Sequence, residues 1–461
     1  MMRNKPTKEY LYFDTTCRNP RRIRQMLKVV QKFDGQILTN ALCEEMIKEL
    51  IKFKWFKSKS SMDMLDKTDP RANEKNWNEY WKSEKPFTDE EAYKIINTWK
   101  PSRTWPGFRG SPSDPHWAHR WHQYFLDPKI YGLVYYEAPG TGEDEDKLAK
   151  PFEITELGYK LIRAIPEDEV AHDLYRTESI TVDEQIIFCH IMSKFESSNP
   201  FRRVSFQNSS LPLLLSTLLT LKNIGEKPHI SHSEMLLLIF WKNNDPKELA
   251  NYLKLFRSNK IHKDDMKAVE KVLIKDLKLA GSPFTAKASI NSSIDGYWRR
   301  LRATGLFVRK GFTYILDLNE IALIKYIIKA YLPIKTVGFS EKQYANYAST
   351  IDRKILSYKQ KVKFANTSRI NAIANYLSWD QIKNELTKCY KSGRNSTIAE
   401  VDGLKASLRY EFFCAVAIAK KFKETKVKSN CKTDSFGWPI SFASGMSGTN
   451  TGADIECFEQ N

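Results

Sequence analysis

Three acidic residues near the end of the chain could hold a divalent cation. Asp454 and Glu456 share one face of the alternating stretch ADIECFE, and Glu411 lies in LRYEFFCAVAIA, which predicts an apolar helix. Mg²⁺ prefers oxygen ligands and keeps several waters, one of which can attack a phosphodiester. Carboxylates from a helix and a strand would begin such a site, with Glu456 as either a third ligand or a polar surface residue. The alternative is that Glu411 and Asp454 are ordinary surface carboxylates.

Two clusters of basic residues could contact nucleic acid. One follows a proline at a predicted helix start in RNPRRIRQMLKVV, where the helix N-terminus can face a phosphate. The other lies in YWRRLRATGLFVRKG, which predicts a helix and then a strand that ends in a turn. Guanidinium groups on such a helix can bind guanine in the major groove, while cations at the turn neutralise phosphates. The candidates are Arg21, Arg22, Arg24, Arg299, Arg300, Arg302, Arg309 and Lys310.

A solvated basic face is the alternative for both clusters. In the second cluster, Trp298, Leu301 and Leu306 would then form the apolar side of the same helix and strand. Phosphate and sugar contacts outnumber base contacts, so phosphate binding is the more general expectation for any one arginine.

Three histidines at three-residue spacing raise the possibility of zinc. They are His116, His119 and His122 in the stretch DPHWAHRWHQYF. No cysteine or carboxylate completes a known zinc spacing, and imidazoles among tryptophans are more typical of packing or of contact with a DNA backbone.

The composition limits the class of protein. The chain has 461 residues, 73 Lys and Arg against 55 Asp and Glu, and a net charge of +18, which favours a polyanionic partner. Double-stranded DNA fits this charge better than an acidic membrane surface, because no basic amphipathic stretch stands apart from the rest. The 7 cysteines are scattered and form no CxxC pair, which is typical of a reducing cytoplasm. No signal segment opens the sequence, and no apolar run reaches the roughly 20 residues of a membrane span.

The first predicted module covers residues 1–175. It opens with two amphipathic helices, the first beginning after Asn19-Pro20. Leu133–Tyr135 is then expected to pair as a strand with Phe152–Ile154, and Thr155 to cap the helix that follows. Helices followed by a strand pair predict a winged-helix-like module.

The second predicted module covers residues 176–333 and repeats this order. A capping box joins Ser231 and Glu234 at the start of a helix predicted from ISHSEMLLLIFW. Further helices lead to a strand pair that turns at Lys310-Gly311 and to a closing helix. Residues 334–400 predict a helical linker, and residues 401–461 an apolar helix with a closing strand. The expected fold is therefore α+β and mostly helical.

Several stretches, in the same order along nearly the whole chain, resemble the AlwI family of type IIS restriction endonucleases, whose relatives include nicking enzymes. The similar stretches are YFDTTCRNPRRIRQMLKVVQKFDG, RATGLFVRKGFTYILDLNE, LRYEFFCAVAIA, DSFGWPISFASG and ADIECF. The resemblance implies a DNA-recognition region, a helical linker and a nuclease domain of the PD-(D/E)xK type in a bacterial cytoplasmic enzyme. It implies Mg²⁺-dependent hydrolysis of phosphodiesters outside a short asymmetric site, with Asp454 as a metal ligand and Glu411 as a second active-site carboxylate.

One part of the family pattern has no counterpart here. The next strand of the nuclease domain, which carries a further glutamate, is expected after Asn461, so we expect residues 401–461 to be the N-terminal part of an incomplete nuclease domain. A second nuclease subunit or a homodimer would then supply a complete site for double-strand cutting. The alternative function is a catalytically inactive, sequence-specific DNA-binding protein or a winged-helix regulator.

Overall fold

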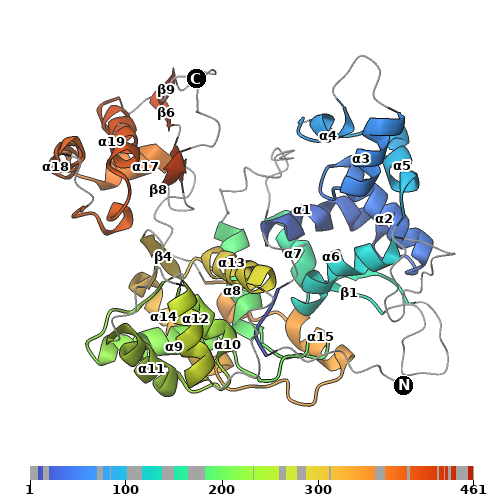
Figure 1. Cartoon of the computed structure of the whole chain (residues 1–461), viewed down its shortest axis with the longest axis horizontal. Helices are drawn as coiled ribbons and strands as arrows, with labels where there is room; N and C mark the ends of the chain where they lie inside the picture. The colour runs from blue at the N-terminus through green and yellow to red at the C-terminus, as the bar shows by residue number, and fades with distance from the viewer. Residues whose placement is uncertain are drawn as a thin grey trace.

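Figure 1 shows the course of the chain in the computed structural model, and the buried apolar side chains of the described residues form two hydrophobic cores. One cluster of buried apolar residues runs from Tyr10 to Ile355, and the other from Ile370 to Trp438. The described residues are 9–13, 20–69, 76–83, 85–100, 117–137, 150–164, 182–231, 233–258, 266–277, 287–310, 313–358, 369–391, 395–422, 425–429, 431–433, 438–442 and 455–459.

The N-terminal elements of the larger core are helices with one small hairpin. On the first helix Ile23, Leu27 and Val30 are fully buried, because their spacing puts them on one side, as the sequence predicts. The elements are α1 (Arg21–Val30), the 3₁₀ helix η2 (Gln31–Phe33), α2 (Asn40–Lys52), α3 (Lys59–Thr68), α4 (Trp77–Tyr80), α5 (Asp89–Thr98), α6 (Ala118–Ile130), β1 (Val134–Tyr135), β2 (Glu153–Ile154) and α7 (Glu156–Arg163).

The hairpin and the helix after it confirm the sequence prediction closely. Val134 pairs with Ile154 in an antiparallel register. The Thr155 hydroxyl accepts the backbone N–H of Gly158 at 3.1 Å and so caps α7. This cap sets the angle at which α7 leaves the hairpin.

The second half of the larger core adds helices and a three-stranded antiparallel sheet in the order β3-β5-β4. Trp298 stacks on Tyr314 with ring centroids 3.7 Å apart, which joins α13 to the sheet. The elements are α8 (Val182–Lys194), α9 (Ser210–Asn223), β3 (His229–Ser231), α10 (Met235–Phe240), α11 (Pro246–Ser258), α12 (Met266–Asp276), α13 (Lys287–Ala303), β4 (Phe307–Lys310), β5 (Thr313–Leu316), η4 (Leu318–Glu320) and α14 (Ile321–Tyr331).

One strand of this sheet differs from the sequence prediction. The reciprocal contacts of the predicted capping box are present, since the Ser231 N–H donates to the Glu234 carboxylate at 2.7 Å and the Ser231 hydroxyl accepts the Glu234 N–H at 3.3 Å. The helix nevertheless begins only at Met235, because Ile230 and Ser231 pair with β5 as part of β3. The predicted turn at Lys310-Gly311 lies outside the described residues, which end at Lys310 and resume at Thr313.

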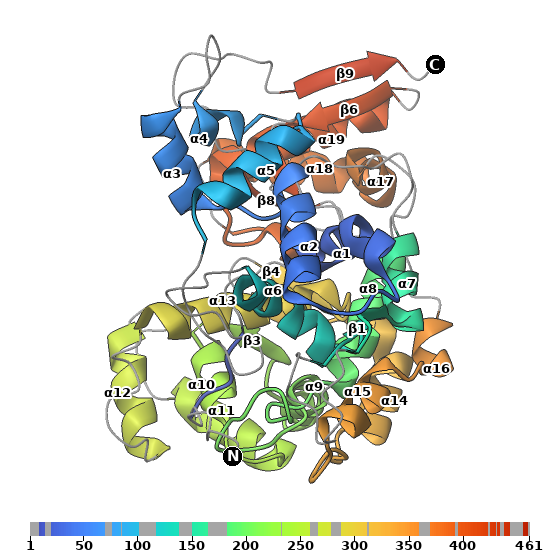
Figure 2. The ribbon, with the colours of Figure 1, turned by 90° about the vertical axis from the view of Figure 1, so that its right-hand side faces the viewer.

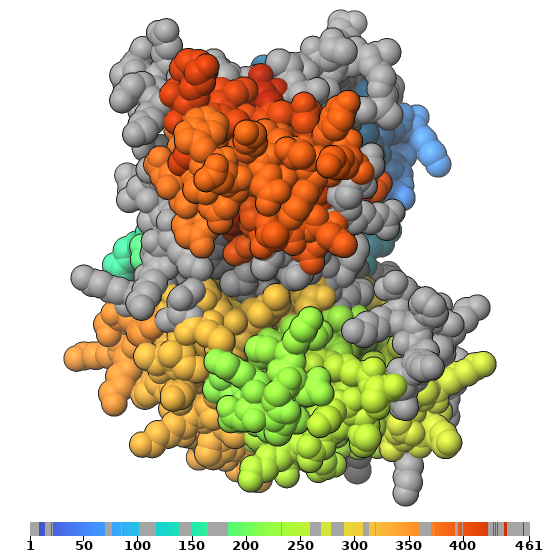
Figure 3. Space-filling view, turned by 90° about the vertical axis from the view of Figure 1, so that its left-hand side faces the viewer, coloured from blue at the N-terminus to red at the C-terminus, as the bar shows by residue number. Residues whose placement is uncertain are grey.

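The elements from residue 369 onward form the smaller core, and Figure 3 shows the surface of this part in orange and red above the rest of the molecule. Figure 2 shows β6 and β9 side by side, and they pair antiparallel, as do β7 and β8. The remaining elements are α15 (Glu341–Ser349), α16 (Arg353–Leu356), α17 (Arg369–Tyr376), α18 (Trp379–Tyr390), η5 (Ala399–Val401), α19 (Ala406–Lys421), β6 (Thr425–Ser429), β7 (Cys431–Thr433), β8 (Pro439–Phe442) and β9 (Ile455–Glu459).

The packing groups the chain differently from the four predicted segments. Elements of 1–175 and 176–333 share the larger core, and buried residues of α15 and α16 also belong to it. The helices α17 and α18 pack instead in the smaller core with α19. The region 334–400 is thus divided between two cores.

The α+β, mostly helical fold class is as predicted. None of the helices in the described ranges has the length and apolar character of a membrane span.

A glycine in α7 allows this helix to lie against the hairpin. A Cβ at Gly158 would stand 2.2 Å from the Leu133 carbonyl oxygen, a backbone atom that cannot move aside easily. We expect Gly158→Ala to lower the free energy of unfolding by about 1–3 kcal/mol, measured by urea denaturation. Lys160→Ala on the same helix should change it by less than about 0.5 kcal/mol. Equal effects of the two substitutions would contradict the close packing.

Candidate functional site

Glu411 lies on α19 at the edge of the smaller core. The apolar side of this helix buries Phe412, Phe413 and Val416, which leaves the Glu411 side chain partly exposed. The hydroxyl of Ser429 and the thiol of Cys431 each lie 3.4 Å from the carboxylate Oε1. Neither residue carries a pattern in the sequence that links it to Glu411, because the contact arises only when β6 and β7 pack on α19.

The start of β9 is connected to this carboxylate through β6. Ile455 pairs with Ser429 in the antiparallel register, and it packs against the smaller core. Glu456 follows in β9 opposite Lys428. Asp454, the other predicted metal ligand, lies outside the described residues, as does the side chain of Glu456. The three predicted carboxylates therefore remain a prediction, of which the structure describes one side chain.

The surroundings of Glu411 suit a hard cation. Its carboxylate oxygens are the ligand type that Mg²⁺ prefers, and its partly exposed position would leave room for water ligands. Within the described residues, no group of three His, Cys, Asp or Glu side chains is arranged to bind a metal ion. Any complete site would thus need residues such as Asp454.

Three histidines were considered for zinc. His119 and His122 are buried, and the Tyr136 hydroxyl lies 3.0 Å from His122 Nδ1. His116 lies outside the described residues.

The described arginines of α1 differ from one another in burial and in hydrogen-bond partner. Arg24 is 2% exposed and its Nη1 donates to the Glu184 carboxylate of α8 at 2.9 Å. This buried ion pair corrects the expectation that Arg24 contacts DNA. Arg22 is partly buried and donates to the Trp55 carbonyl, while the side chain of Arg21 lies outside the described residues.

The arginines of α13 also divide into two kinds. Arg299 has 47% of its side chain exposed and pairs with Asp295 one turn earlier at 3.0 Å, and Arg302 is partly exposed. Arg300, in contrast, is fully buried. Its burial removes it from the predicted DNA-contacting group and makes it a structural residue. Arg309 and Lys310 pair through their backbones with β5, and their side chains lie outside the described residues.

A buried carboxylate joins three distant segments of the chain. Asp127 of α6 accepts the Nη2 group of Arg300 at 2.6 Å on one oxygen and the Nη2 group of Arg202 at 2.6 Å on the other. All three side chains are 0% exposed. The other nitrogens of Arg300 donate to the Tyr131 hydroxyl and to the Gly296 carbonyl, the latter at 2.9 Å. We call these groups the Asp127 network.

Close packing supports the Asp127 network. The Phe13 ring lies 4.1 Å from the Arg300 guanidinium carbon, and a Cβ on Gly296 would come within 3.2 Å of both Arg300 and Phe13. Burial opposes the charge of Arg300, but the neighbouring Tyr131 and Asp127 raise its pKa above the usual value. The charged form of the guanidinium is therefore retained inside the core, where it fixes α13 against α6.

Comparison with known proteins gives a family match for the middle of the chain. Residues 131–349 match the model of a restriction endonuclease family. That family is described as AlwI restriction endonuclease, so the resemblance stated from the sequence is confirmed over this stretch.

Among solved structures, the chain is similar to the BpuJ1 endonuclease binding domain, which was crystallised with pyrene- and phenanthrene-modified DNA. The two are 17% identical, with 50% of this chain and 76% of that chain covered and a TM-score of 0.33. A search of curated proteins gave no match.

The Asp127 network predicts a large effect from a small change. Asp127→Asn keeps the shape but leaves two buried guanidinium groups without their shared carboxylate, so we expect a loss of about 3–5 kcal/mol in the free energy of unfolding. Glu45→Gln, at the exposed pair with Lys48, serves as the matched control and should cost less than about 1 kcal/mol. Both values come from urea denaturation followed by tryptophan fluorescence. A loss below about 1 kcal/mol for Asp127→Asn would contradict the structural role of the network.

Proposed function

We propose that this chain is a type IIS restriction endonuclease that recognises a short asymmetric site in double-stranded DNA and hydrolyses phosphodiesters outside that site with Mg²⁺. The family match over residues 131–349 carries the proposal. The net charge of +18 supports it, because a basic protein is attracted to a polyanion.

Recognition is assigned to the larger core. Helix α13 is the candidate DNA-recognition helix, since it precedes the β4–β5 pair and presents Arg299 and Arg302 toward solvent. Their guanidinium groups can bind base edges or phosphates, and Arg309 and Lys310 of β4 are proposed to add phosphate contacts. Arg21 and Arg22 are proposed as a second contact near the start of α1. Arg24 and Arg300 hold the fold from inside.

Hydrolysis is assigned to the smaller core. Glu411, Asp454 and Glu456 would hold Mg²⁺, which supplies charge neutralisation and an acidified water when bound. The Ser429 hydroxyl and the Cys431 thiol, each 3.4 Å from the Glu411 carboxylate, would keep that carboxylate oriented. Because the cutting residues and the reading residues belong to separate cores, cleavage would fall at a distance from the bases that are read. A homodimer or a second nuclease subunit would be needed to cut both strands together.

The test is a cleavage assay with a matched pair of variants. Purified protein, with a second nuclease subunit where the site needs one, and plasmid DNA in Mg²⁺ should give fragments whose ends lie at a fixed offset from one shared sequence. Glu411→Gln should reduce cleavage at least a hundredfold, because the ligand charge is lost, while gel-shift binding to the same DNA remains. Glu400→Gln, a partly buried carboxylate of the same unit, should leave cleavage unchanged.

Each contrary result has a distinct meaning. Cleavage that persists in Glu411→Gln would show that the active site lies elsewhere. Site-specific binding by the parent chain without cleavage in any divalent cation would favour the alternative of a DNA-binding protein without catalysis.

A further inference from the structure

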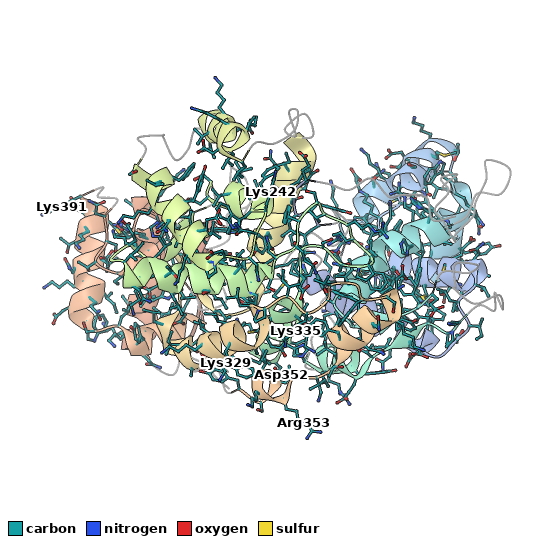
Figure 4. The ribbon with its side chains drawn as sticks, turned by 90° about the horizontal axis from the view of Figure 1, so that it is seen from below. Lys242, Lys329, Lys335, Asp352, Arg353 and Lys391 are labelled. Atoms are coloured by element: carbon teal, nitrogen blue, oxygen red, sulfur yellow. The ribbon has the colours of Figure 1, made fainter. Side chains whose placement is uncertain are left out.

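Five exposed cations lie together on one face of the larger core. They belong to α14, to the segment after it, and to α16, and Figure 4 shows Lys329, Lys335 and Arg353 beside Asp352 at its lower edge. We call this surface the α14–α16 face, and its cations are Lys325, Lys329, Lys335, Arg353 and Lys354. Among the described residues, none of these five cations has a carboxylate partner in an ion pair.

Aromatic rings hold two of these cations in place. The Lys335 ammonium lies 4.9 Å from the centre of the Tyr331 ring, and the Lys354 ammonium lies 5.4 Å from the centre of the Tyr326 ring. Such contacts position a lysine without neutralising it. The charges therefore stay available to a partner.

The nearest carboxylate on this face is already engaged. Asp352 Oδ2 accepts the hydroxyls of Tyr331 at 2.6 Å and Tyr326 at 2.7 Å, and its Oδ1 accepts the backbone N–H of Lys354 at 2.8 Å. Burial opposes ionisation of Asp352, but these donors hold its pKa below the usual value. The buried Glu196 carboxylate also lies close to this face and accepts the Lys335 backbone N–H at 2.9 Å, so five cations outnumber two carboxylates and the face is positive.

Some lysines of the protein are neutralised by a partner. The partly exposed Lys48, Lys52 and Lys160 each pair with a nearby carboxylate. On α14, by contrast, Lys325 and Lys329 stand one turn apart, and no acidic residue lies three or four positions from either. Beneath them, burial lowers the pKa of Lys194 to about 8, and its ammonium donates to the Tyr347 carbonyl at 2.8 Å.

We propose that the α14–α16 face binds the phosphate backbone of duplex DNA, as a contact surface additional to α13 and β4. The inference rests on the proposed function, which makes duplex DNA the substrate. Cations about 6 Å apart along a helix can neutralise successive phosphates, and contacts to phosphate carry no sequence information. A protein partner is a poorer fit, because protein interfaces have an apolar centre, and Val337 is the large apolar side chain that this segment exposes.

The first test compares two sets of four substitutions. One variant carries Lys325→Gln, Lys329→Gln, Arg353→Gln and Lys354→Gln. The control carries Lys242→Gln, Lys247→Gln, Lys383→Gln and Lys391→Gln, at exposed lysines that include two shown apart from the face in Figure 4. Both variants lose the same charge, so a difference between them reports position.

The readout is the salt dependence of binding to a short duplex. The logarithm of the association constant falls linearly with the logarithm of the salt concentration, and each lost phosphate contact should make this slope less steep by about 0.9. The slope of the face variant should therefore be less steep by about 3–4 units, and that of the control by less than about 1. Sequence preference, measured by selection from a random duplex library, should stay the same in both. An unchanged slope in the face variant, or an equal fall in the control, would overturn the proposal.

The second test uses the unaltered chain. Acetylation of Lys325, Lys329 and Lys335, followed by mass spectrometry, should slow at least fivefold when duplex DNA is bound. Equal reactivity in the free and bound protein would overturn the proposal and would point to a different partner, such as an acidic protein. If the parent chain binds no duplex DNA at low salt, the proposed function itself fails, which separates the two failures.

Discussion

The arrangement of the larger core depends on one buried carboxylate. Asp127 binds Arg202 and Arg300 at 2.6 Å each, and so ties α6 to α13 and to the segment between α8 and α9. A buried charge is stable only where its partners and hydrogen bonds are in place. The packing of each of these three segments therefore depends on the other two. The candidate DNA-recognition helix α13 is thereby fixed relative to the N-terminal helices, and this fixes the side of the larger core on which its exposed arginines lie.

The proposed function divides DNA positioning and hydrolysis between the two cores. The larger core contains the three-stranded sheet, and it contains α13 and the α14–α16 face, whose described residues present cations. The smaller core contains α19, where Glu411 meets Ser429 and Cys431 at its edge. Separate cores allow one unit to hold DNA while the other reaches a bond outside the contacted bases. The last buried residue of the larger core is Ile355 and the first of the smaller core is Ile370.

The sequence predicts the local elements well because their signals are local. The Thr155 cap and the buried face of α1 follow from residues within a few positions of one another, and the Val134–Ile154 pairing joins two strands that are neighbours in chain order. It predicts the roles of Arg24 and Arg300 poorly, because their partners Glu184 and Asp127 are 160 and 173 positions away. A basic residue on a helix looks the same in sequence whether it faces solvent or a buried carboxylate. The short strand β3 is missed for a similar reason, since its partner β5 is distant.

The central claim, that the Asp127 network makes the larger core one cooperative body, is tested most directly by native-state hydrogen exchange on the whole chain. As denaturant is raised, amides of α6 and α13 should converge on one opening free energy, while amides of α18 and α19 follow a different one. This result is expected because α6 and α13 cannot part without exposing two buried guanidinium groups. Opening of α13 at a free energy well below that of α6 would contradict the account.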